Sequence, residues 1–102
     1  MNVVFLVMDT VRKDFVSPFN KDVTYTENIE RIAEEGKAFY NAVSQAPWTL
    51  PSHGSMFTGL YPWEHGATQT NLKLDVEDDL LAEKLRSEGY RTGCFSANPF
   101  IS

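Results

Sequence analysis

The segment TLPSHGSMFTG, residues 49–59, says most about how this chain folds and what it does. Its proline fixes its own φ and biases the residue before it towards extended geometry, so the segment begins as a stiff turn. Ser52 is a favoured helix N-cap, and Gly59 can take the positive φ that ends a helix. We therefore predict a short helix directly after a turn that presents the Thr49 hydroxyl. Because N–H groups at such a turn favour an anionic ester, the hydroxyl is placed to attack a phosphate or a sulfate.

Length and charge narrow the class of protein. At 102 residues the chain has room for one small domain, and its net charge of −5 argues against a general nucleic-acid-binding role. Its single cysteine, Cys94, excludes an intrachain disulfide and a zinc-finger spacing. The apolar run 3–8 is far shorter than the roughly 20 residues of a membrane span, and it lacks a basic leader and a cleavage site. We expect a cytoplasmic protein with neither nucleic-acid nor membrane partners.

Three segments have the composition of β-strands. Residues 3–8, VVFLVM, form a continuous β-prone apolar run of the kind that is buried on both faces of a parallel sheet. Residues 38–43 and 90–97 are the next strand candidates. Asp9 follows the first strand, at the carboxyl end where ligands of open α/β sheets gather.

Two amphipathic helices are expected between these strands. Thr26 can cap the first, which Gly36 ends. The second spans about 78–88 and is stopped by Gly89. Its apolar face is expected to point inward: Leu80, Leu81 and Leu85. The order of elements predicts an α/β fold with a partial, mainly parallel sheet and flanking helices.

Several motifs occur in a specific order along most of the chain. They are Asp9, Arg12 and Asp14, TENIERIAEEG (26–36), Phe39, Asn41 and Ala42, residues 49–59 continuing into LYP (60–62), His65-Gly66, LAEKL (81–85) and GYRT (89–92). In this order they resemble the N-terminal part of sulfatases of the alkaline-phosphatase-like superfamily. The resemblance implies that 1–102 is the truncated N-terminal part of a sulfatase-like catalytic domain. It also implies that further metal ligands and basic sulfate-binding residues lie in the remaining C-terminal part of that domain.

The chain departs from the family pattern at two places. Sulfatases carry Cys or Ser at the nucleophile position, in a Cys/Ser-x-Pro-Ser-Arg motif, and convert it to formylglycine; here Thr49 holds that position and His53 replaces the arginine. Threonine is not a substrate for the conversion, but threonine nucleophiles occur in related phosphodiesterases and phosphonate hydrolases. The usual Asp-Asp pair after the first strand is Asp9-Thr10.

The resemblance assigns roles to four of these residues. Asp9, Thr10 and Thr49 would bind a divalent cation, with Ca²⁺ or Mg²⁺ favoured by oxygen ligands and Mn²⁺ or Zn²⁺ possible if histidines join from downstream. Thr49 would be the catalytic nucleophile, and His53 would orient it or donate to a non-bridging oxygen. The competing interpretations are structural: a turn-capping Asp9, a Thr49 hydroxyl bonded to backbone, and a half-buried His53 satisfied by backbone.

Three functions follow from these assignments. The first is a metal-dependent sulfuric ester hydrolase acting on a small-molecule sulfate or phosphate ester. The second is a phosphodiester or phosphonate monoester hydrolase of the same superfamily, and the third is a non-catalytic α/β binding module. The 102-residue piece alone is expected to be inactive, because two metal ligands without a distal basic clamp cannot hold a cation tightly.

Four other features receive structural interpretations. Arg12 and Asp14 could form an ion pair behind Asp9. We expect His65 to end a structural loop, Cys94 to be a small core residue, and the glutamates of 27–35 to face solvent.

Overall fold

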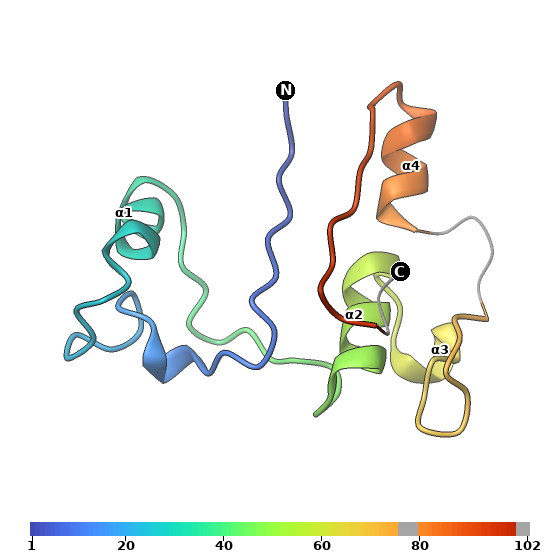
Figure 1. Ribbon diagram of the computed structural model, residues 1–102, viewed down its shortest axis with the longest axis horizontal. Helices are drawn as coiled ribbons and strands as arrows, with labels where there is room; N and C mark the ends of the chain where they lie inside the picture. Colours follow the sequence, from blue (N-terminus) through green and yellow to red (C-terminus); the bar gives the residue numbers. More distant parts are fainter. Residues whose placement is uncertain (76–79, 100–102) are drawn as a thin grey trace. The chain divides into compact units, whose positions relative to one another are not determined.

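The computed structural model describes residues 1–75 and 80–99 (Figure 1). In these ranges it contains a short 3-10 helix and four α-helices: η1 (Lys13–Phe15), α1 (Glu27–Glu35), α2 (Thr49–Thr58), α3 (Pro62–His65) and α4 (Leu81–Ser87). The chain divides into two units, Met1–Ala42 and Val43–Ser102, and each is described by itself. None of the helices in the described ranges is both long enough and apolar enough to cross a lipid bilayer.

The predicted α/β fold is wrong for the residues that the structure describes, because none of them forms a β-strand. Segments 3–8, 38–43 and 90–97 run as irregular chain. A strand exists only when a neighbouring strand accepts and donates its backbone hydrogen bonds, and β-prone composition does not supply that neighbour. Val4 and Leu6 are 89% and 80% exposed, so the apolar run is not buried either. Cys94 is likewise exposed, which corrects its assignment to the core.

Tyr40 anchors segment 38–43 through its side chain and its carbonyl group. Its hydroxyl donates to the Pro18 carbonyl oxygen at 3.1 Å, and its ring meets Phe19 edge-on with centroids 5.3 Å apart. Lys13 Nζ donates to the Tyr40 carbonyl oxygen at 3.2 Å. These contacts, which all lie within the first unit, fold the segment onto a loop.

Helix α1 begins and ends where the sequence predicts, between Thr26 as N-cap and Gly36 as C-cap. The Thr26 hydroxyl does not cap the helix, however; it accepts from the Ser17 backbone N–H at 2.8 Å. A tertiary hydrogen bond has replaced the local one. Ile32 is 70% exposed, so the apolar side of α1 has little cover, and the glutamates are exposed as expected.

Helix α2 starts earlier than predicted. Thr49 is its first residue and Trp48 its N-cap, whereas the sequence favoured a start after Ser52. Proline fits this first turn because its missing N–H would have no intrahelical partner there. The Ser52 Oγ lies 2.9 Å from Ser44 Oγ instead of capping the helix. Gly59 ends α2 as predicted, with a φ of 75° and its N–H donating to Ser55 O at 2.8 Å.

Helix α3 lies in a stretch that was expected to be mostly loop. It begins with Pro62 at its first position, and the Glu64 carboxylate accepts from the Tyr61 backbone N–H at 2.8 Å. Gly66 ends it with a φ of 75°. Tyr61 and Trp63 stack face to face with ring centroids 4.5 Å apart.

Helix α4 matches the C-terminal part of the predicted helix at 78–88; residues 78 and 79 lie outside the described ranges. It ends at Ser87 with Glu88 as C-cap, and the predicted stop, Gly89, follows directly with a φ of 87°. The Tyr90 N–H donates to Leu85 O at 3.0 Å. This is the hydrogen bond of a Schellman motif, in which a residue in the left-handed region follows the C-terminus of an α-helix. Leu81 is 39% exposed, contrary to the inward position expected for it.

Few apolar side chains are buried in the described part of the chain. They are Val16 and Val23 in the first unit, and Leu50 and Ala67 in the second. Helix α2 contacts both α3 and α4, so the second unit packs around α2. Most of the large apolar side chains remain accessible to solvent.

The isolated 102-residue chain is expected to melt without a sharp transition and to bind the dye ANS, because burial of apolar area is the main source of cooperativity. Calorimetry together with ANS fluorescence measures both properties. A single sharp heat-absorption peak without dye binding would contradict this expectation.

Candidate active site

Thr49 and His53 lie one helical turn apart at the start of α2. His53 Nδ1 is 2.9 Å from the Thr49 carbonyl oxygen, and the ring is 7% exposed. Since a carbonyl oxygen only accepts, Nδ1 must carry the hydrogen. The ring also meets Phe57 edge-on, with centroids 6.0 Å apart. The contact that the structure shows between the two residues is therefore to the Thr49 backbone.

This hydrogen bond fixes what the other nitrogen of His53 can do. In the neutral ring Nε2 carries a lone pair, so it can accept a proton or a hydrogen bond. It can donate to an anionic oxygen only when the ring is doubly protonated. The two roles expected for His53, orienting Thr49 and donating to an ester oxygen, therefore use different ring atoms.

Asp9 and Thr10 form a tight turn in the first unit. The Thr10 backbone N–H donates to Asp9 Oδ1 at 2.9 Å, and both residues are exposed. Thr10 has a φ of 62°, in the left-handed region that β-branched residues rarely adopt. Such a conformation costs roughly 1–2 kcal/mol per residue, and strain of this kind often accompanies functional sites.

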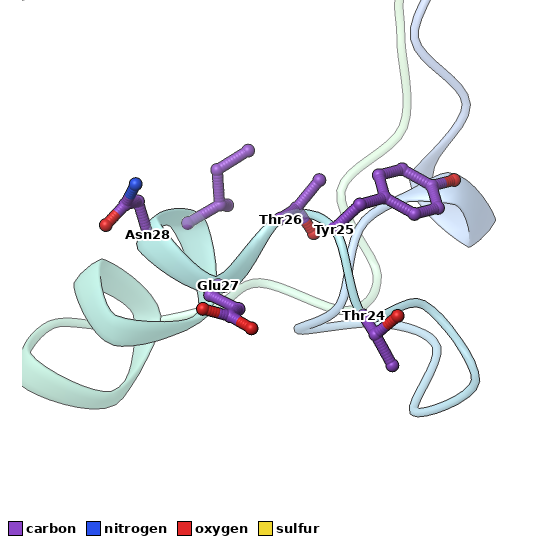
Figure 2. Close-up of a pocket in the computed structure, with 6 residues that line it drawn as sticks. Thr24, Tyr25, Thr26, Glu27 and Asn28 are labelled. Atoms are coloured by element: carbon purple, nitrogen blue, oxygen red, sulfur yellow. The ribbon is translucent and has the colours of Figure 1, made fainter.

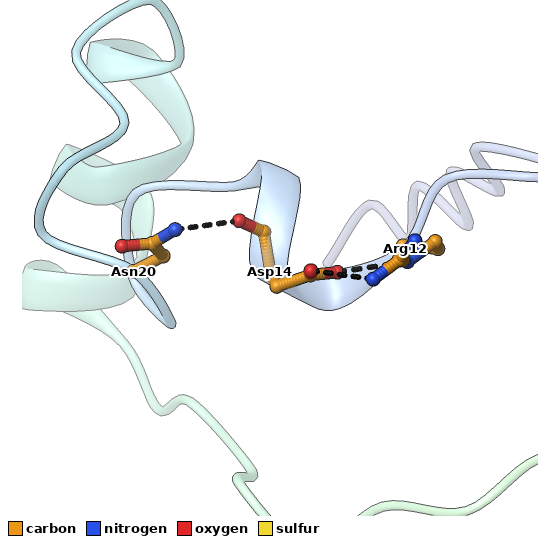
Figure 3. A network of polar contacts seen from close by, with 3 residues as sticks. All are labelled: Arg12, Asp14 and Asn20. Carbon is orange, nitrogen blue, oxygen red and sulfur yellow. Dashed lines mark hydrogen bonds and ion pairs between the residues drawn. The ribbon is translucent and has the colours of Figure 1, made fainter.

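The predicted ion pair between Arg12 and Asp14 is confirmed (Figure 3). The guanidinium binds the carboxylate with both Nε, at 3.1 Å from Oδ1, and a terminal nitrogen, at 2.7 Å from Oδ2. Asn20 Nδ2 donates to the Asp14 carbonyl oxygen at 2.9 Å, which ties the turn to the following loop. The pair is solvent-accessible, so its contribution to stability is at most about 1 kcal/mol.

The predicted site residues form two pairs, one within each unit of the structure. Thr49 and His53 meet within the second unit, and Asp9 and Thr10 within the first. An ion shared between the two pairs stays a prediction. Across residues 1–75 and 80–99, no three His, Cys, Asp or Glu side chains gather into a set that could hold a metal. The oxygen donors suit a hard cation, but they are too few to form its site unaided.

His65 is a residue whose importance the sequence did not reveal. It ends α3, its side chain is fully buried, and its ring makes hydrogen bonds to residues of α2. Histidine is intermediate between the residue types that are usually buried and those that are usually exposed, so the sequence carried no signal for this burial.

A surface depression lies elsewhere, at the start of α1 in the first unit (Figure 2). Its lining contains none of the predicted site residues: Thr24, Tyr25, Thr26, Glu27, Asn28 and Ile29. We assign it no part in the candidate site.

Comparison with known proteins identifies the family. The model of the sulfatase family matches residues 1–100. The chain belongs to the sulfatase family. The resemblance found in the sequence is thereby confirmed, and with it membership of the alkaline phosphatase superfamily.

Several curated relatives match across most of the chain. The multifunctional alkaline phosphatase superfamily protein PehA of Trinickia caryophylli is 35% identical over 98 residues, covering 87% of this chain and 18% of the relative. The ulvan-active sulfatase of Formosa agariphila is 32% identical over 91 residues, covering 89% and 18%. The N-acetylgalactosamine-6-O-sulfatase of Bacteroides thetaiotaomicron is 28% identical over 97 residues, covering 90% and 19%.

The sulfatase-family chain described here thus spans less than a fifth of the length of these relatives. That share agrees with the expected fragment of a longer catalytic domain. No solved structure gives a significant match to it.

Proposed function

We propose that the full-length protein is a sulfuric ester hydrolase in which Thr49 is the nucleophile. Membership of the sulfatase family supports ester hydrolysis as the reaction class. The observation that carries the assignment of Thr49 is its place as the first residue of α2, where helix geometry favours a bound anion. A small-molecule sulfate ester is the proposed substrate.

The proposed reaction has two displacement steps. Thr49 Oγ1 attacks sulfur in line, its proton is lost, and the bond from sulfur to the alcohol oxygen breaks as the alcohol leaves with a proton. Water then attacks the sulfur of the enzyme ester, the bond from sulfur to Oγ1 breaks, sulfate is released, and a proton from the water re-forms the threonine hydroxyl. No oxidation or reduction takes place in either step.

His53 is proposed to act at the same turn. Through Nδ1 it holds the Thr49 carbonyl group and so restrains the backbone of the nucleophile. Its Nε2 is the atom available to the chemistry, either as acceptor of the Thr49 proton or, when the ring is cationic, as donor to a non-bridging oxygen. Arginine in that place would be permanently cationic, so histidine supplies charge only when it is protonated.

A divalent cation is proposed as the cofactor, with Ca²⁺ or Mg²⁺ preferred over Mn²⁺ or Zn²⁺. Asp9, Thr10 and Thr49 would contribute oxygen ligands, and the remaining C-terminal part of the domain would supply the others. When bound, the cation would supply positive charge that favours an ionised hydroxyl and an anionic ester. The need for downstream ligands is why we expect the isolated 102-residue chain to be inactive.

A phosphodiester or phosphonate monoester hydrolase is the second candidate. Threonine in place of Cys or Ser at position 49 favours it, since related enzymes with those activities use threonine. A relative named as a multifunctional superfamily member adds support. A non-catalytic binding module is the third candidate, which is supported both by threonine at the nucleophile position, Thr49, and by Thr10 in place of a second aspartate.

Parallel assays of the full-length protein should rank the three candidates. We expect hydrolysis of an aryl sulfate to exceed that of an aryl phosphodiester and of a phosphonate monoester in kcat/KM. Faster turnover of either phosphorus ester would favour the second candidate. Absence of turnover of all three esters by metal-loaded protein would favour the binding module.

Replacement of Thr49 by valine should remove activity while keeping the β-branched shape. We expect Thr49→Val in the full-length protein to lower kcat by at least about a thousandfold, as loss of a nucleophile does in other hydrolases. Thr49→Ser is the matched control, because it keeps the hydroxyl and should retain measurable turnover. Full activity of the valine variant would rule out Thr49 as nucleophile.

Restoring the second carboxylate at position 10 should tighten cation binding. We expect Thr10→Asp in the full-length protein to lower the Kd for Ca²⁺ or Mg²⁺ by about tenfold or more, because carboxylate count tunes such sites. Titration calorimetry measures the Kd. Thr10→Gly is the control, since it relieves the left-handed strain but removes the Thr10 hydroxyl as a ligand, and it should not lower the Kd. Equal gains in both variants would show that strain, rather than the ligand, limits binding.

A further inference from the structure

His65 is fully buried within the second unit, and both of its ring nitrogens make hydrogen bonds. The Ala67 backbone N–H donates to Nδ1 at 3.2 Å, so Nδ1 carries a lone pair and no hydrogen. Nε2 lies 3.2 Å from the Pro51 carbonyl oxygen, which only accepts, and 3.1 Å from Ser55 Oγ. The hydrogen bonds therefore select one neutral tautomer, with the hydrogen on Nε2.

The ring also lies directly on the backbone of α2. A Cβ added at Gly54 would come within 2.7 Å of Cε1 and 3.0 Å of Nε2 of His65. Pro51, Gly54 and Ser55 are spaced to lie on one face of the helix, so a single buried side chain contacts that face by packing and by hydrogen bonds. Pro51 is only two residues after Thr49, in the same first turn.

The Ser55–His65 pair resembles a nucleophile and its base but cannot act as one. A base must have its lone pair facing the hydroxyl, whereas Nε2 carries the hydrogen here and Nδ1 accepts from a backbone N–H. The zero exposure of the ring also keeps substrate away from it. The pair is therefore a structural contact between α3 and α2.

We propose that His65 is a positioning residue that sets the first turn of α2 and thereby the placement of Thr49 and His53. The proposal rests on the proposed function of Thr49. It follows from the geometry because the ring holds the Pro51 carbonyl group, and a backbone shift in that turn would move the Thr49 hydroxyl with it. A misplacement of about 1 Å at reacting atoms can cost about a hundredfold in rate.

The test is a set of variants in the full-length protein, assayed on the best of the three esters. We expect His65→Ala to lower kcat by about tenfold or more while KM changes less than about twofold. His65→Gln keeps a donor near the Nε2 position and should recover part of the lost kcat. Gly54→Ala should lower kcat because its Cβ displaces the ring, and it should add little in the His65→Ala background.

Gly59→Ala is the matched control. It places a side chain at a φ of 75° at the end of α2, where no atom of any residue beyond the two chain neighbours lies within 4 Å of the added Cβ. It should lower thermal stability and leave kcat unchanged, which separates general destabilisation from positioning.

An unchanged kcat in folded His65→Ala or Gly54→Ala would overturn the proposal, as would multiplicative effects in the double variant. If neither alanine variant folds, His65→Leu decides. Leucine fills much of the same space without a donor for the Pro51 carbonyl oxygen, so a folded leucine variant with the kcat and KM of the parent would also overturn the proposal. Failure of the proposed function is recognised separately. If Thr49→Val kept full activity, Thr49 would not be the nucleophile, while the coupling of His65 and Gly54 in thermal unfolding would remain measurable.

Discussion

The contact between the His65 ring and the backbone of α2 is the interaction on which the second unit depends. The buried apolar side chains described there, Leu50 and Ala67, provide little area to fix one helix against another. Hydrogen bonds in a buried environment are directional, and leaving a buried polar atom unpaired is costly. The ring therefore restricts α2 and α3 to one mutual arrangement, and Gly54 makes that arrangement sterically possible.

Sequence reasoning located the ends of helices better than any other feature, because those ends depend on local chemistry. Gly59 and Gly89 stop their helices with positive φ, as glycine permits. The prediction of strands was wrong because a strand depends only in part on its own sequence. An apolar β-prone run such as 3–8 states a preference, but a strand needs a partner in the same structure. The start of α2 was misplaced by four residues, because Ser52, which resembled an N-cap, contacts Ser44 instead.

In the candidate site, too, features that depend on local sequence could be predicted and features that depend on tertiary contacts could not. Thr49 and His53 are four residues apart, which is about one helical turn, so their proximity could be inferred from their spacing in the sequence. It could not reveal which ring atom faces the backbone, since that depends on how the imidazole turns. The left-handed φ of Thr10 could not be predicted either, because β-branched residues such as threonine rarely adopt that conformation. The joining of Asp9 and Thr49 around one ion stays a prediction.

The exposed thiol of Cys94 has a practical consequence. It is the single cysteine of these 102 residues, and it lies in a segment whose neighbours are accessible as well. An alkylating reagent would therefore modify one known position of this chain. In the proposed full-length protein, the rate of alkylation of Cys94 would measure how far other parts of the polypeptide cover the 90–97 segment.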